Sequence, residues 1–301
     1  LSVGDNTFII KTLAENGDEK TYTVKVNRKR VLQNISIFGK QFEVLDEEPT
    51  LTTTSLKAGD EDGLYKSTAT NSGEPTYYFR GNVTNNYVSF AGQTWRIVRI
   101  NEDGTIRMIM QNGINNNEYT KFNSNNNNYT YMYYTNGQAK SILESWYQTN
   151  IGSKSELANK VASGSYYCEQ AKAKYPGYTS GSASMSDYTS YTPDFKCATD
   201  GNSKGKVNAS IGLLTYDEAV YAGGYYVKGN SNYYLYNGEY FWTMSPAGFS
   251  GSYASVWHIG KAGDLYNHGA DSTSSLRPVL ILKADTLVTG TGTSSDPFII
   301  K

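Results

Sequence analysis

His258 and His268 are the two histidines of this 301-residue chain, and histidine is the side chain whose ordinary pKa suits proton transfer near neutral pH. They lie close in sequence to Ser245, Ser255 and Asp264, so a Ser–His–Asp arrangement could be assembled from this stretch. Nothing like a nucleophile elbow surrounds either serine. Histidines in a strand–turn–strand segment are more often exposed loop or edge residues than catalysts, and we therefore do not expect an enzyme.

Cys168 and Cys197 are the only cysteines, and they allow a single disulfide. The bridge would close a loop of 29 residues (197 − 168), which the chain-entropy model values at about 3–4 kcal/mol of stability. Two cysteines alone cannot complete a structural zinc site. We favour the disulfide over two free thiols, and with it an oxidising, extracellular location.

The composition is polar but carries little charge. Only 18% of the residues are charged and the net charge is −1, which leaves no basic surface for nucleic acid or for an anionic membrane. No apolar run approaches the roughly 18 residues that a membrane helix needs. The 27 tyrosines, with Asn, Ser and Gly, give the composition of adaptable recognition surfaces, which a secreted β-rich protein with tyrosines on its strands would also have. Because the chain has neither an initiator Met nor a signal peptide, we expect a piece of a longer precursor.

Turn signals and alternating apolar residues predict two hairpins. In the first, Thr7–Leu13 and Thr21–Val26 flank a turn at Glu15–Asp18. In the second, Gln93–Ile100 and Thr105–Met110 flank an Asp-Gly turn. A lone hairpin is marginal in water, so the first one needs a partner sheet.

Two stretches have the pattern of helices. Within Gln138–Ile151, apolar residues recur with the period of one buried helix face: Ala139, Ile142, Leu143, Trp146 and Tyr147. Thr215–Glu218 has the pattern of a capping box and predicts a short helix that ends at Ala222.

The remaining segments read as loops or short strands. Trp242–Leu282 predicts short strands joined by tight turns, with a long irregular loop over Asn267–Ser275. The Asn-rich stretch 111–137 reads as a long surface loop, or alternatively as a Tyr/Asn binding flap. Gly164–Asn208 reads as an insertion that holds both cysteines.

Several strings resemble known bacterial surface proteins. YYFRGNVTNNYVSFAGQTWRIVRINEDGTIRMI, IGLLTYDEAVYAGG, YYLYNGEYFWTMSP, SSLRPVLILK and GTGTSSDPFII resemble a family of uncharacterised surface proteins from gut Firmicutes, which looks like a bacterial branch of the C-type lectin-like fold. GDNTFIIKTLAENGDEKTYTVKVNRK near the N-terminus resembles the last two strands of cadherin-like β-sandwich repeats.

The resemblance implies an α+β, C-type lectin-like fold with short antiparallel sheets, two helices and paired terminal strands. The implied division is a cadherin-like remnant over 1–30, a linker or strands over 31–57, and the lectin-like domain over 58–301. Trp95–Ile100 should then lie near Val279–Leu282. The family usually carries paired cysteines where Cys168 and Cys197 stand, which supports the disulfide.

The resemblance also implies a binding surface. In relatives diversified by retroelements, the varied side chains lie on the last strands and their connecting loops. Carried over residue by residue, these positions are Tyr253, Trp257, His258, Asp264, Tyr266, Asn267, His268 and Asp271. Aromatic residues with polar tips beside Asn and Asp suit sugars or a protein epitope. Trp257 could equally be a core residue, and for Trp242 we favour the core.

The chemistry of better-known branches of this fold does not carry over. The formylglycine-generating enzymes resemble one another in two cysteines near the C-terminal end, and this chain has no cysteine after Cys197. Calcium-dependent sugar lectins have E-P-N or Q-P-D followed by W-N-D, where this chain has Glu74-Pro75-Thr76 and Trp242-Thr243-Met244. We expect no cofactor, although the Asp- and Asn-rich loops would suit a structural calcium ion.

The expected function is a non-catalytic ligand-binding module of a bacterial cell-surface adhesin, carbohydrate binding being one form of it. Its partner would be a host or microbial glycan or a surface protein, and neither nucleic acid nor a membrane. The alternative is a structural or assembly subunit of a surface stalk or pilus. An enzyme that has kept the formylglycine-generating fold without its cysteines is the third reading.

Overall fold

The structure, a computed structural model, describes residues 2–46, 49, 51, 61–164, 166–169, 192–197, 205–226 and 228–301. The end of the segment predicted as a linker or strands over 31–57, the domain boundary expected there, and much of the Gly164–Asn208 insertion lie outside the described residues.

The fold is mostly β, and the expected α+β, C-type lectin-like fold with two helices is wrong. Strands make up 42% of the structure and helices 14%, and the strands form two large sheets with four α-helical segments beside them in the described part. The physical reason lies in composition, since Tyr, Ile, Val and Thr favour the pleated, half-buried surface of a sheet. Stretches expected to be short strands or loops therefore pair into long ones.

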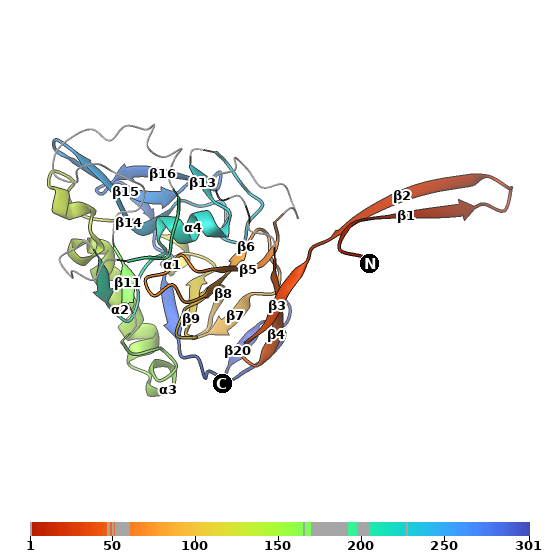
Figure 1. Ribbon diagram of the computed structural model, residues 1–301. Helices are drawn as coiled ribbons and strands as arrows, with labels where there is room; N and C mark the ends of the chain where they lie inside the picture. The colour runs from red at the N-terminus through yellow and green to blue at the C-terminus, as the bar shows by residue number, and fades with distance from the viewer. Residues whose placement is uncertain are drawn as a thin grey trace.

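The larger sheet runs through the body of the molecule (Figure 1), and its buried side chains form one core with those of the smaller sheet and of the two predicted helices. Eight of its strands run in the order β19-β20-β7-β8-β6-β5-β4-β3, and β9 joins β8 to β18. Its members are β3 (Val31–Ile37), β4 (Lys40–Leu45), β5 (Gly63–Ser67), β6 (Thr76–Arg80), β7 (Tyr87–Phe90), β8 (Gln93–Ile100), β9 (Ile106–Met110), β18 (Val279–Leu282), β19 (Val288–Thr289) and β20 (Phe298–Ile300). The predicted hairpin of β8 and β9 is confirmed.

The C-terminal segment folds back onto that hairpin, as predicted. β18 runs antiparallel to β9, with Val279 opposite Ile109 and Leu282 opposite Ile106. β20 then adds in parallel to β7 on the far side of β8. β3 and β4 also belong to this sheet, because Val44 pairs with Leu64 of β5.

The smaller sheet carries most of the last third of the chain. Its order is β10-β17-β14-β15-β16-β13, from β10 (Tyr119–Lys121), β13 (Tyr225–Tyr226), β14 (Phe241–Ser250), β15 (Tyr253–Ile259), β16 (Asp264–Gly269) and β17 (Thr273–Ser275). The irregular loop predicted over Asn267–Ser275 is wrong, because that stretch is the end of β16, a short turn and β17. A third, small sheet pairs β11 (Tyr166–Cys168) with β12 (Lys206–Asn208).

Both predicted helices are confirmed. α2 (Gln138–Tyr147) buries Ala139, Leu143 and Tyr147 and continues into a π-helical turn, η3 (Gln148–Gly152). α4 (Tyr216–Ala222) begins with the predicted capping box between Thr215 and Glu218. The shorter segments are α1 (Ile114–Asn117), η1 (Tyr129–Met132), η2 (Tyr134–Asn136) and α3 (Ser155–Ala158). None of the helices in the described part has the length and apolarity to cross a membrane.

The predicted N-terminal hairpin is also confirmed, and it projects from the body (Figure 1). β1 (Gly4–Leu13) and β2 (Glu19–Arg28) pair over ten positions and form a two-stranded sheet of their own. Because no layer covers either face within the described structure, apolar side chains remain exposed, among them Ile9 (66%) and Leu13 (70%).

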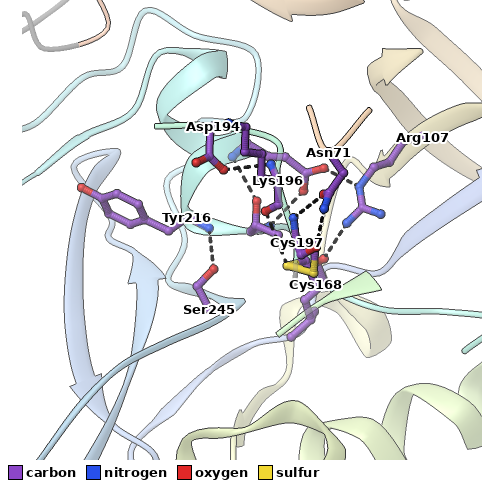
Figure 2. The surroundings of a disulfide bond; sticks show 11 residues. Asn71, Arg107, Cys168, Asp194, Lys196, Cys197, Tyr216 and Ser245 are labelled. Carbon is purple, nitrogen blue, oxygen red and sulfur yellow. Dashed lines mark hydrogen bonds and ion pairs between the residues drawn. A yellow bond between two sulfur atoms is a disulfide. The ribbon is translucent and has the colours of Figure 1, made fainter. Parts of the chain in front are cut away.

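The predicted disulfide Cys168–Cys197 is present, with its Cα atoms 5.8 Å apart, within the usual range. Figure 2 shows Asn71 beside it. The Asn71 side chain donates to the Cys197 carbonyl (2.7 Å) and accepts from the Cys197 amide (2.6 Å). Next to it, Phe195 stacks on Tyr221 (centroids 4.1 Å apart). The bridge therefore fixes a connecting segment against the core rather than joining two free loops.

A buried ion network lies beneath the disulfide. Oε1 of Glu218 lies 2.6 Å from Nε of Arg107 and 3.1 Å from Nε of Arg99, and its Oε2 accepts from the Thr215 amide (2.9 Å). Burial alone would raise the pKa of Glu218, but the two guanidinium groups and the Thr215 hydrogen bond outweigh it, so the net pKa is lowered. One carboxylate thus links β8, β9 and the first turn of α4.

Replacing Glu218 with Gln should lower the free energy of unfolding by about 3 kcal/mol, because buried Arg107 loses its counter-ion and Arg99 is left with Glu102 alone, 3.5 Å away. The measurement is urea unfolding at neutral pH. Glu144→Gln is the matched control, since the side chains of the Lys140–Glu144 pair on α2 are 25% and 45% exposed. Its loss should change stability by less than about 0.5 kcal/mol. A Glu218→Gln protein as stable as the control would contradict this assignment.

Candidate functional site

The structure separates the eight predicted site residues into three groups. Asp264, Tyr266 and Asn267 on β16 line one surface cavity, and His268 is exposed beside them. Tyr253, which is 46% exposed, and Asp271 both approach Gly269 at the other end of the strand. Trp257 and His258 are 0% and 1% exposed and belong to the core, which leaves them unavailable as surface contacts. Trp242 is a core residue, as favoured from the sequence.

The cavity, which we call the tyrosine cavity, has a volume of about 580 Å³ and opens to solvent. It lies at one edge of the smaller sheet, where β13 pairs in parallel with β16. The lining residues are Tyr226, Tyr240, Lys261, Ala262, Asp264, Tyr266 and Asn267. A volume of this size is in the range of small-molecule sites.

Four of the lining residues were missed from the sequence: Tyr226, Tyr240, Lys261 and Ala262. Tyr226 and Tyr240 stand in Tyr-rich strings, YYVK and YYLYNGEYFW, that gave no reason to choose one tyrosine over another. Tyr226 reaches the cavity because β13 pairs with β16 across nearly forty residues of chain. Lys261 lies in the tight turn between β15 and β16, and its place between two predicted site strands was a signal that could have identified it.

A polar cluster fixes one rim of the cavity. The Tyr119 hydroxyl donates to Glu239 (2.5 Å) and accepts from the Tyr240 amide (3.3 Å). Lys261 lies 3.7 Å from the same Glu239 oxygen and 5.5 Å from the centre of the Tyr240 ring. The neighbouring Tyr119 and Glu239 raise the pKa of Lys261, so its ammonium group is charged at neutral pH. The rim therefore presents a cation held over aromatic rings.

The cavity floor rests on a row of aromatic rings that crosses the sheet. Trp242, His258 and Tyr266 stand opposite one another on β14, β15 and β16, and the ring of His258 lies 5.4 Å from Trp242 and 4.0 Å from Tyr266. Burial, followed by a hydrogen bond to Tyr240, raises the pKa of Tyr266. The tyrosine hydroxyl is therefore neutral and can both donate and accept a hydrogen bond.

His258 is held neutral inside this row. Its Nδ1 lies 3.1 Å from the Ser274 hydroxyl, and its Nε2 has no hydrogen-bond partner among the described residues. Burial, with a smaller effect from His268, lowers the pKa of His258 to about 3. A base this weak holds almost no proton near neutral pH.

The Ser–His–Asp arrangement considered from the sequence does not form. Ser245 accepts from the Tyr216 amide (2.9 Å), and Ser255 donates to the Gly248 carbonyl (3.1 Å), so each hydroxyl has a partner other than His258. Across the described ranges, no group of three His, Cys, Asp or Glu side chains is arranged to hold a metal ion.

Comparisons of the chain with models of known families, with characterised proteins and with solved structures find no match.

Acidification should destabilise the fold through His258. Its pKa is about 3 when folded and ordinarily 6.5, so between these values the unfolded chain binds the extra proton. The contribution is fully present above the unfolded pKa and is lost as the pH falls toward 3. From pH 7 to pH 5 this amounts to about 2 kcal/mol.

The measurement is urea unfolding at both pH values for the wild type and for His258→Gln, which keeps a polar side chain but does not titrate. The variant should lose much less stability over this interval. Equal losses in the two proteins would show that His258 is not the group responsible.

Proposed function

We propose that this chain is a non-catalytic ligand-binding module of an extracellular bacterial surface protein, and that its ligand, a glycan or a surface protein, occupies the tyrosine cavity. The observation that supports it is the cavity itself, in which three tyrosines surround Lys261, Asp264 and Asn267. Tyrosines supply rigid contact area with a polar tip, and the charged and amide side chains can form directional hydrogen bonds that orient a ligand.

Two further observations support binding rather than catalysis. His258, the histidine nearest the cavity floor, is buried with its pKa at about 3, which makes it unsuited to general-base work at neutral pH. The cavity is open rather than deep and enclosed, as expected of a recognition platform. The Cys168–Cys197 disulfide supports an oxidising, extracellular compartment.

Removing a tyrosine from the cavity should weaken binding. Wild-type protein screened on glycan and host-protein arrays should bind at least one class, and Tyr240→Ala and Tyr266→Ala should each lower its affinity roughly tenfold, as loss of a central aromatic contact does. Tyr129→Ala is the control, since Tyr129 is 40% exposed and lies outside the cavity. The proposal is refuted if nothing binds on either array, or if no bound ligand class loses affinity in the two cavity variants.

A structural or assembly subunit is the second candidate, and the β1–β2 hairpin is the observation that favours it. Six large apolar side chains of the hairpin are at least 40% exposed: Phe8, Ile9, Ile10, Leu13, Tyr22 and Val24. Exposed strand edges with apolar faces promote pairing between chains. Sedimentation velocity across a hundredfold concentration range distinguishes the two candidates, because assembly predicts association that Ile9→Lys abolishes, whereas the binding module stays monomeric.

A further inference from the structure

A second surface depression, which we call the α2 groove, lies along α2 and shares no lining residue with the tyrosine cavity. Its volume is about 520 Å³. One wall is α2 with its π-helical continuation, where lining residues recur every four positions, as residues on one helix face do. They form a hydroxyl stripe, Ser141, Ser145 and Thr149, beside a second stripe, Ile142, Trp146 and Asn150.

The opposite wall is a turn whose backbone has the left-handed conformation. Asn115, Asn116 and Asn117 have φ values of +50°, +59° and +62°, a left-handed conformation that asparagine tolerates better than most residues but that still costs energy. The Asn117 side chain holds it by accepting from the Gly113 amide (2.6 Å), and Asn115 donates to Glu118 (2.9 Å). Backbone of this kind clusters at ligand sites, and here it brings Asn115 to the groove.

Trp146 faces the groove although its helical position predicts burial. Ala139, Leu143 and Tyr147 of the predicted apolar face are buried, whereas Trp146 remains half-buried. Its ring packs edge-on against Trp95, with centroids 6.4 Å apart, and Trp95 is itself fully buried. The indole is therefore a fixed platform at the surface.

The groove has no charge of its own. Five of its eight lining residues carry a hydroxyl or a carboxamide, and in the described structure no Asp, Glu, Lys or Arg lines it. The nearest charges on α2, Lys140 and Glu144, pair with each other. An anionic ligand would find no counter-ion among the lining residues, and the Glu118 carboxylate bonded to Asn115 on the opposite wall would repel it, so the chemistry favours a neutral ligand.

The hydrogen-bonding groups of the groove are oriented by the helix. The Thr149 hydroxyl donates to the Ser145 carbonyl (3.0 Å), and the Asn150 amide donates to the Trp146 carbonyl (2.8 Å). These bonds use donors, so Oγ1 of Thr149 and Oδ1 of Asn150 keep acceptor capacity for ligand hydroxyls. Rigid acceptors beside an aromatic ring match a molecule with one apolar face and a rim of hydroxyls.

We propose that the α2 groove binds a neutral saccharide, with a pyranose ring stacked on Trp146 and its hydroxyls bonded to the Ser, Thr and Asn side chains. This site is independent of the tyrosine cavity and does not rest on the function proposed for it.

Tryptophan fluorescence reports on the groove directly. All four tryptophans lie in the described ranges, and three are 0% exposed: Trp95, Trp242 and Trp257. Acrylamide should therefore quench mainly Trp146. Titration of the whole chain with cellohexaose, maltohexaose, mannohexaose and the hexamer of N-acetylglucosamine should show at least one that halves the quenching constant saturably, and hexagalacturonate, the anionic comparison, should not.

Two variants locate the binding. Trp146→Ala, followed by calorimetry because the reporter is lost, should weaken affinity at least tenfold. Asn115→Gly should weaken it several-fold while keeping the turn, since glycine adopts positive φ without strain. Asn116→Gly is the matched control, because Asn116 has the same conformation but does not line the groove, and should bind as the wild type does.

The proposal is overturned if none of the four neutral oligosaccharides binds, if hexagalacturonate or a protein from the host-protein array protects Trp146 instead, or if Asn115→Gly and Asn116→Gly bind equally well. Tyr266→Ala should leave groove binding unchanged, so failure at this site is distinguishable from failure at the tyrosine cavity.

Discussion

The antiparallel pairing of β18 with β9 is the constraint on which the rest of the structure depends. It brings residues 110 and 278 next to each other, so the chain between them must begin and end at the same place on the larger sheet. Arg277, immediately before β18, reinforces this closure: Nε donates to the Met110 carbonyl (3.0 Å), and the guanidinium lies 4.4 Å from the centre of the Phe241 ring. A planar, multi-donor group with apolar faces can do both. One buried side chain therefore ties the β8–β9 hairpin to β14, and through β14 it positions the smaller sheet.

The chemistry of the tyrosine cavity follows from how that sheet is buried. Trp242 and His258 are buried in the core, while their neighbour Tyr266 is partly exposed. The aromatic row therefore runs from the core to the solvent-exposed edge of the sheet. Because the buried end carries no charge at neutral pH, the ionised groups collect at the rim, where Lys261 and Glu239 pair. A rigid, neutral floor with a polar rim limits the entropy lost when a ligand is bound.

The parts of the fold with strong local signals could be predicted from the sequence, and the parts decided by distant pairing could not. The Asp-Gly turn of β8–β9, the capping box at Thr215 and the apolar period of α2 each depend on neighbouring residues, and all three are confirmed. Asn267–Ser275 was read as loop because its polar residues do not alternate with apolar ones. The end of β16 and β17 nevertheless lie in it as strands, because β15 and β10 pair with them. Tyr226 reached the cavity through a parallel pairing that no local pattern reveals. The fold class, which the resemblance implied, was wrong, and no local pattern could correct it because sheet topology depends on pairing between distant segments.

The two proposed sites differ in whether charged side chains line them. The tyrosine cavity carries Lys261 and Asp264 at a sheet edge, whereas the α2 groove is lined by neutral groups. Since the core clusters into one body that includes both Trp146 and Trp242, the sites keep a fixed separation. A ligand long enough to meet both would bind its second site as an intramolecular event, with an effective concentration set by that separation. One extended ligand could therefore contact both sites only if the spacing of its parts matched that separation.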